Sequence, residues 1–333
     1  MSGAETAQQP GQGATGFRSR RDFLVVRGVD AEAYLQGQLS QDVSALAVGS
    51  SADALLLEPD GKLTVLLRVT RTETECFVLD LDGGYGAAAL ARLQRFLLRA
   101  KVTVEPLGWR CLSLRGQGVA ESARALVQSL GGSEALSVGF AWNGWNGVDL
   151  LGPEAIVPDI AGLPEGIAVI GADEVEVRRI MAGIPAMGTE LTTKTIAAEA
   201  GLVERTVSFT KGCYTGQELI ARLDARGTRV PRRLVGVIAP PDSVPLARGM
   251  TLHAGIPPAA AVDSGTDGAG GDDVAADKVV GSLTSAAWNE ECGAWVALGY
   301  LHRSVEAPGP IRVRSGDGTG GWHPARTTML PIG

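Results

Sequence analysis

The chain has 333 residues, of which 45% are hydrophobic, and its formal net charge is −7. That length suits two or three domains of about 100–200 residues each, and the negative charge argues against a broad basic face for nucleic acid. No apolar run approaches the roughly 18 residues that a membrane helix needs. The cysteines lie far apart without a CxxC pair, which favours a reducing, cytoplasmic compartment and proposes no metal site: Cys76, Cys111, Cys213 and Cys292.

The N-terminal third alternates short apolar strands with two helices. Residues 1–19 lack the apolar core of a secretory signal, so we expect a disordered tail, and we interpret the GxGxxG match at 11–16 as coincidence because no strand precedes it. A Pro-Asp-Gly turn at residues 59–61 joins two apolar runs and indicates a hairpin. The expected elements are strands at 23–26, 54–58, 63–69 and 76–81, a helix that Asp30 caps, and a helix at 87–98.

A second α+β region follows, and then a barrel. Apolar spacing predicts strands at 102–104 and 111–114 and helices at 120–130 and 173–181. We expect an N-terminal region at 20–228, made of two α+β subdomains between which the chain passes near residues 106 and 171. Short strands without a clear helix predict a small β-barrel over 229–333. Residues 257–277 are Ala, Gly, Asp and Pro with almost no bulky apolar side chain, which predicts a disordered insertion.

The segment Lys-Gly-Cys-Tyr-Thr-Gly-Gln-Glu at 211–218 carries the most chemistry. Thr215 and Glu218 have the spacing of a capping box, so a helix would begin there. Cys213 would lie two residues before the cap, where the helix dipole and the charge of Lys211 favour the reactive thiolate. The alternative is that Cys213 is a small buried hydrophobe and that the capping box only starts a helix.

This segment resembles the signature of the YgfZ family of folate-binding proteins, relatives of the glycine-cleavage aminomethyltransferase (T-protein). Further blocks resemble the family in the expected order at 30–39, 59–62, 179–185, 199–202, 281–285 and 297–301. The resemblance implies an α+β, aminomethyltransferase-like fold with two ferredoxin-like subdomains and a C-terminal β-barrel around a central folate channel. It also implies a tetrahydrofolate-binding accessory protein in iron–sulfur cluster assembly or repair, with folate and iron–sulfur assembly or client proteins as partners.

The resemblance makes Cys213 the reactive thiol, with Lys211 to tune it, and places Tyr214, Gln217 and Glu218 among the folate-binding residues. Arg222 and Arg226 follow the signature and are candidates to bind the glutamate tail of a folate, although such a charge run is as often a solvated face.

Glu190 lies in a block that resembles the wall of the folate pocket, where a carboxylate accepts donors from the edge of a pterin ring. The alternative reading of Glu190 is an exposed acid beside a turn.

The chain departs from the aminomethyltransferase pattern where that enzyme has its acids. Asp80 and Asp82 fall inside or at the end of the third strand, before the place expected for the catalytic aspartate, and Met181 stands where the enzyme has a pocket Glu. Carbon transfer at folate N5 needs a carboxylate close to the reacting centre. We therefore expect no aminomethyltransferase activity of the usual kind. The alternatives are a folate-dependent aminomethyltransferase or demethylase and a thiol-redox protein with a vestigial folate channel.

Overall fold

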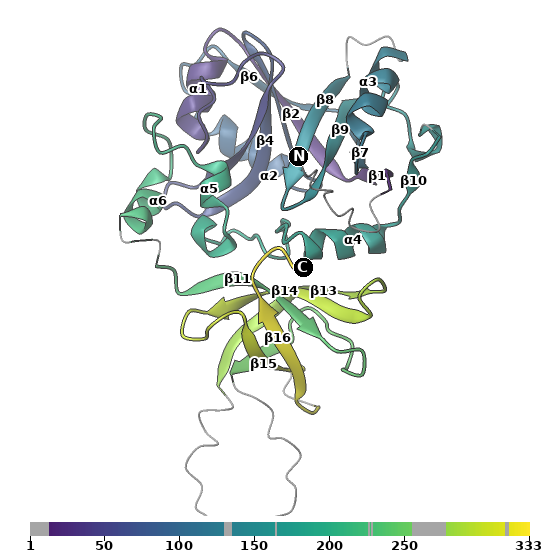
Figure 1. The fold of residues 1–333 in the computed structure, drawn as a ribbon. Coiled ribbons are helices and arrows are strands. Elements are labelled where there is room, and N and C mark those ends of the chain that lie inside the picture. The colour runs from purple at the N-terminus through teal and green to yellow at the C-terminus, as the bar shows by residue number, and fades with distance from the viewer. Residues whose placement is uncertain are drawn as a thin grey trace, which may run out of the picture. The chain divides into compact units, whose positions relative to one another are not determined.

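The computed structural model describes residues 13–129, 135–163, 165–225, 227, 229–254, 278–316 and 320–333 (Figure 1). The chain divides into two compact units, one of Met1–Arg21 with Gly108–Ala172 and one of Asp22–Leu107 with Asp173–Gly333. The expected insertion at 257–277, the first twelve residues of the expected tail and Arg226 lie outside the described residues. No helix in the described ranges is both long and apolar enough to cross a membrane.

The first unit is a sheet with the strand order β10-β1-β7-β9-β8. Its core pairs Leu112, Leu114 and Leu150 of the sheet with Val119 and Ala123 of the helix α3. The expectation of a tail through residue 19 is wrong at its end, because residues 15–19 form the strand β1 and pair with β7 along their whole length. The elements are β1 (Thr15–Ser19), β7 (Trp109–Arg115), α3 (Val119–Ser129), β8 (Leu136–Trp142), β9 (Trp145–Pro153), η1 (Ile160–Gly162) and β10 (Ala168–Val169).

The second unit begins with a sheet in the order β3-β4-β5-β2-β6. Arg68 and Asp80 lie opposite each other on β4 and β5 and form a buried two-point ion pair at 2.9 and 3.1 Å. A buried charge is tolerated when it is paired in this way, so Asp80 serves the sheet. The elements are β2 (Arg21–Arg27), α1 (Ala31–Gln38), β3 (Ser51–Leu57), β4 (Leu63–Glu73), β5 (Cys76–Asp82), α2 (Gly86–Gln94) and β6 (Thr103–Leu107).

A helical passage links this sheet to a closed barrel with the strand order β11-β14-β13-β12-β15-β16, and the predicted mixed α+β class with a C-terminal barrel is confirmed. Alternate barrel residues such as Val235, Val237, Leu252 and Val313 fill its interior. The elements are α4 (Ala172–Met181), η2 (Ala197–Ala200), α5 (Val203–Thr206), α6 (Gln217–Asp224), β11 (Arg232–Ala239), β12 (Thr251–Ala254), β13 (Val279–Asn289), β14 (Ala294–His302), β15 (Gly309–Arg314) and β16 (His323–Thr328).

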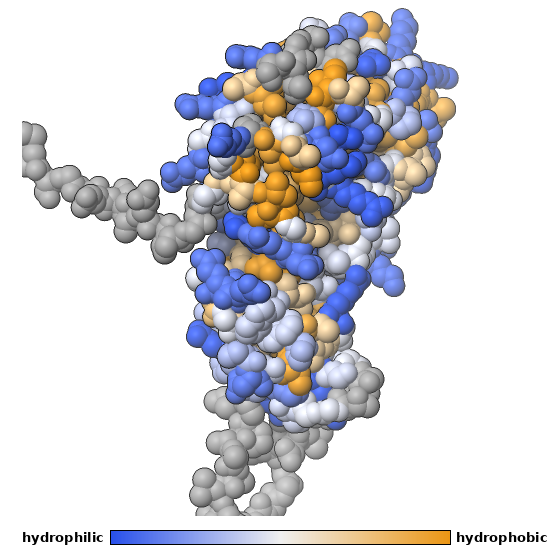
Figure 2. All heavy atoms as spheres, turned by 90° about the vertical axis from the view of Figure 1, so that its right-hand side faces the viewer, coloured by the Kyte–Doolittle hydropathy of each residue, from blue (hydrophilic) through white to orange (hydrophobic). Residues whose placement is uncertain are grey.

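The surface is divided between apolar and polar side chains. On the face drawn in Figure 2, bands of hydrophilic side chains separate the patches of hydrophobic ones. The described large apolar side chains that are exposed are scattered along the chain, as is usual for protein surfaces: Val29, Val48, Leu98, Val169, Phe209, Val279 and Met329.

Candidate functional site

The signature segment is a loop that leads into α6. The helix begins at Gln217, after Gly216 in a left-handed conformation (φ 86°), and no side chain caps it. The predicted capping box of Thr215 and Glu218 is therefore wrong. The side-chain oxygen of Gln217 instead accepts a hydrogen bond from the backbone N–H of Tyr214 at 3.1 Å, which closes the turn before the helix.

Glycine is required at the start of α6 because another motif packs directly against it. A Cβ atom on Gly216 would lie 2.6 Å from the Glu58 carbonyl oxygen, and one on Gly61 would lie 2.5 Å from the Cβ of Leu219. Real Cβ atoms do not approach so closely, and both glycines also have positive φ. The Pro-Asp-Gly turn and the signature segment, far apart in sequence, therefore form one packed feature.

The ammonium group of Lys211 binds the end of α1. Its Nζ donates hydrogen bonds to the carbonyl oxygens of Gln36, Leu39 and Gln41 at 2.6, 2.6 and 3.0 Å. The last carbonyls of a helix have no partner within the helix, and the negative end of the helix dipole lies there. One cation with three donors satisfies both requirements, so Lys211 fixes the signature loop to the N-terminal helix.

Backbone hydrogen bonds extend this attachment on both sides of Lys211. The N–H of Thr215 donates to the Gly37 carbonyl at 3.0 Å, and the N–H of Ser208 donates to the Ser40 carbonyl at 3.0 Å. The Ser40 hydroxyl also donates to the Thr206 carbonyl at 2.6 Å. Residues 206–215 are thus bonded at several points to residues 36–41.

Burial lowers the pKa of Lys211 to about 8, and the nearby Asp42 carboxylate opposes that shift. Because this pKa still lies above neutrality, the ammonium form with three donors predominates at pH 7. The same ammonium lies 5.0 Å from the centre of the Tyr214 ring, in a cation–π arrangement.

The other predicted residues of the segment divide by exposure. Cys213 is exposed, which makes the buried-hydrophobe alternative wrong, and its thiol forms no hydrogen bond with any described residue. Glu218 and Arg222 are also exposed. Tyr214 is buried, and this burial raises the pKa of its phenol to about 12. The segment and the rest of α6 therefore expose a thiol, a carboxylate and a guanidinium, and the phenol of Tyr214 is buried.

Glu190 occupies a second centre, where the passage after α4 meets the barrel. It is 1% exposed, so the alternative of an exposed acid is wrong. One carboxylate oxygen accepts from Arg179 at 3.0 Å and from the Thr189 hydroxyl at 2.7 Å, and the other accepts from the Ser285 hydroxyl at 2.6 Å. The Ala186 N–H is a further donor at 3.0 Å. Both oxygens are occupied by the protein itself.

The charge state of Glu190 follows from these partners. Burial by itself would raise its pKa, but the charge of Arg179 and the Ser285 hydroxyl outweigh burial and hold the pKa below the usual value of a glutamate. The Tyr300 hydroxyl also donates to the Glu190 backbone carbonyl at 3.0 Å. Glu190 therefore orders residues 184–190 against β13 and β14. Its expected contact with a pterin stays a prediction.

Asp82 ends β5, as expected, and its carboxylate accepts a hydrogen bond from the Met187 N–H at 2.9 Å. This bond joins the first sheet to the same loop that Glu190 orders. The sequence interpretation missed Arg179 and Ser285 as partners of that loop. Each lies within a block that resembles the family. A buried carboxylate needs a cation or hydrogen-bond donors nearby, so an arginine and a serine in such blocks were candidates to bind Glu190.

The chain is similar in sequence to several known proteins. No family model matches the chain. An uncharacterized protein of Haemophilus influenzae is 28% identical over 208 residues, which is 62% of this chain and 66% of that protein, just under two thirds of its length. The tRNA-modifying protein YgfZ of Pectobacterium carotovorum is 27% identical over 230 residues (66% of this chain, 68% of the relative).

Aminomethyltransferases match a larger share of the chain. That of Streptomyces avermitilis is 25% identical over 333 residues, covering 93% of this chain and 83% of the relative. The crystal structure of glycine cleavage system aminomethyltransferase T from Bartonella henselae superposes with a TM-score of 0.75 at 20% identity, over 97% of this chain and 87% of that chain. The chain is thus YgfZ-like and related to the glycine-cleavage T-protein, and the aminomethyltransferase-like fold is confirmed.

Replacing Lys211 by Met should lower the free energy of unfolding by about 2 kcal/mol, because three acceptors at the end of α1 lose their donor. Denaturant unfolding measures this loss. Hydrogen exchange should also accelerate at the amides of Ser208 and Thr215, which lie on either side of the lost contact. Lys194→Met is the matched control, since Lys194 is exposed and its ammonium binds no described residue. Equal, small effects of both substitutions would show that Lys211 is not a structural cation.

Replacing Glu190 by Gln should cost about 2–4 kcal/mol near pH 7, because Arg179 loses its buried carboxylate partner. The folded-state pKa is lower than the unfolded one, so this contribution is present above the unfolded value and is lost as the pH falls through the folded value. The stability difference between the parent and Glu190→Gln should therefore stay constant from neutral pH down to the unfolded glutamate value of 4.5 and shrink as the pH falls further. Exposed Glu204→Gln is the control. A difference that stays constant with pH would contradict the ion pair.

Proposed function

We propose that this protein is a tetrahydrofolate-binding accessory protein that supports iron–sulfur cluster assembly or repair, and that Cys213 is its reactive thiol. The similarity of the chain to YgfZ proteins supports an accessory role of this kind. None of its four cysteines, all of which lie in the described ranges, forms a disulfide, which suits work in the reducing cytoplasm.

The observation that carries the proposal is the attachment of the Cys213 loop to α1. An exposed loop that carries a thiol is ordinarily free to move. This one is held on either side of Cys213, because Lys211 bonds to the Gln36 carbonyl and Thr215 to the Gly37 carbonyl. Rigid support of an exposed, chemically active group is what a reactive site needs. The thiol is accessible to a partner while its backbone position is fixed.

Some of the residues expected to bind folate have hydrogen-bonding groups that are open to a ligand, and others do not. The Tyr214 hydroxyl has no hydrogen bond to a described residue, and Gln217 uses its oxygen but keeps its amide N–H groups. Arg222 is exposed and has no carboxylate partner among the described residues, so its guanidinium is open to the carboxylates of a glutamate tail. Glu190 does not fit as a direct ligand unless one of its donors is released, and we assign it an ordering role. Glu218 is exposed on the same helix as Arg222.

Replacing Cys213 by Ser should abolish complementation of a strain that lacks its YgfZ homologue, while the free energy of unfolding changes by less than about 0.5 kcal/mol, as for most surface substitutions. A serine hydroxyl is not ionised at neutral pH and cannot replace a thiolate. Cys292→Ser is the matched control, because Cys292 is the other exposed cysteine. Full complementation by Cys213→Ser would show that the thiol of Cys213 is not needed. Loss of complementation in both variants would show that the effect is not specific to Cys213.

Tetrahydrofolate should bind the purified protein, and Arg222→Ala should weaken the triglutamate form more than the monoglutamate, since only the longer tail offers additional carboxylates. Isothermal titration with both forms measures this difference. Equal weakening would show that Arg222 does not bind the tail, and no binding of either form would favour the thiol-redox alternative. Aminomethyl transfer to tetrahydrofolate that is lost in Asp82→Asn would replace the proposal by an aminomethyltransferase.

A further inference from the structure

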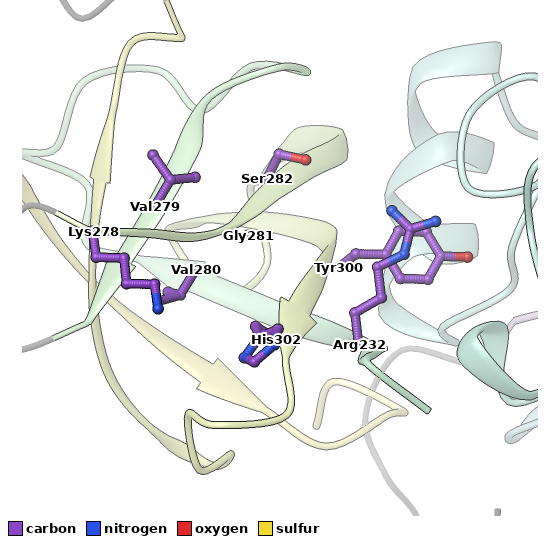
Figure 3. Close-up of a pocket in the computed structure, with 8 residues that line it drawn as sticks. All are labelled: Arg232, Lys278, Val279, Val280, Gly281, Ser282, Tyr300 and His302. Atoms are coloured by element: carbon purple, nitrogen blue, oxygen red, sulfur yellow. The ribbon is translucent and has the colours of Figure 1, made fainter. Parts of the chain in front are cut away.

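The barrel carries a pocket that is separate from the signature loop. It has a volume of about 230 Å³ and lies at the end of β14, flanked by the first residues of β11 and β13 (Figure 3). The backbone of β13 reaches β14 closely there, since a Cβ on Gly281 would lie 2.1 Å from the Tyr300 carbonyl oxygen. The lining residues are Arg232, Lys278, Val279, Val280, Gly281, Ser282, Tyr300 and His302.

Among the described residues that line this pocket the side chains are cationic or neutral, and the carboxylate of Glu199 pairs with Arg232 without lining the pocket itself. Lys278 is exposed, and its ammonium has no hydrogen-bond or ion-pair partner in the described part of the chain. In a chain whose net charge is −7, such a local excess of positive charge favours an anionic ligand.

Arg232 is oriented by two neighbours that leave part of its guanidinium open. Its Nε donates to Glu199 at 3.0 Å, and its guanidinium carbon lies 4.3 Å from the centre of the Tyr300 ring. Figure 3 draws the side chains of Arg232 and Tyr300 next to each other. Neither of its terminal Nη groups is bonded to a described residue. A guanidinium fixed by stacking presents a planar pair of donors, which matches a phosphate or a carboxylate.

His302 adds a further hydrogen-bond donor, and a backbone N–H determines which tautomer its ring adopts. The N–H of Ser304 donates to its Nδ1 at 3.2 Å, so Nδ1 is the acceptor and the neutral ring carries its proton on Nε2. With the Ser282 hydroxyl, the lining offers four different side-chain donors beside an apolar wall formed by Val280.

We propose that this pocket binds the phosphate or carboxylate group of a small molecule. Its volume is below the roughly 300–1,000 Å³ of pockets for drug-sized ligands, so it suits a sugar phosphate or the end of a longer anion. This site is independent of Cys213.

The test is isothermal titration of the full-length protein at fixed ionic strength with ribose 5-phosphate, ribose and a γ-linked triglutamate. Ribose 5-phosphate should bind and ribose should not. Lys278→Met should lower the affinity for ribose 5-phosphate about tenfold. Arg232→Lys should lower this affinity as well, because lysine keeps the charge but not the paired donors. Lys101→Met is the matched control, since it removes one exposed charge from the same unit and should leave the affinity unchanged.

Binding of the triglutamate that depends on Lys278 would identify a carboxylate ligand such as a folate tail, and binding of ribose 5-phosphate alone would identify a phosphate ester. Equal weakening by Lys101→Met and Lys278→Met would overturn the proposal in favour of diffuse charge. It would also be overturned if neither anion bound at millimolar concentration.

Discussion

The ammonium of Lys211, bonded to three carbonyls in and just after the last turn of α1, is the interaction on which the signature loop depends. A helix end has several carbonyls without partners, and no single neutral side chain can satisfy three of them. A lysine can, because its charge suits the dipole and its three donors point in different directions. The position of Cys213 follows from this contact, since it is two residues from Lys211 and two from Thr215, which binds the same helix.

This geometry changes the role that the sequence indicated for Lys211. The expected role was to favour the thiolate of Cys213 by nearness of charge. In the structure the donors of Lys211 are used at the carbonyls of α1, and the ring of Tyr214 lies beside it. We therefore propose that Lys211 acts on the thiol through the position of the loop, as a positioning residue.

The predictable parts of the fold were those with a local signal. Alternating apolar residues located β2 to β5, and the run of short strands located the barrel. The strand β1 was missed because Gly and Gln precede it and its pairing partner, β7, lies about 95 residues away. The hairpin of β8 and β9 was missed although Asn143-Gly144, both with positive φ, is a strong turn signal.

The site was less predictable than the fold, because its contacts join residues far apart in sequence. Ser285 binds Glu190 across 95 positions and Lys211 binds Gln36 across 175, and neither pairing has a local pattern. The capping box failed for the opposite reason, since its spacing is local but the close approach of Glu58 requires Gly216 at the helix start.

The distribution of partners separates the charged residues that support the fold from those that are open to a ligand. Arg68 and Glu190 are buried, Arg179 is partly buried, and all three have charged partners within the protein, so their replacement should be felt first in stability. Arg222 and Lys278 are exposed and bind no described residue, so their replacement should leave stability nearly unchanged. A charge that contributes nothing to folding is free to bind a ligand, and for this reason the binding proposals rest on these exposed cations.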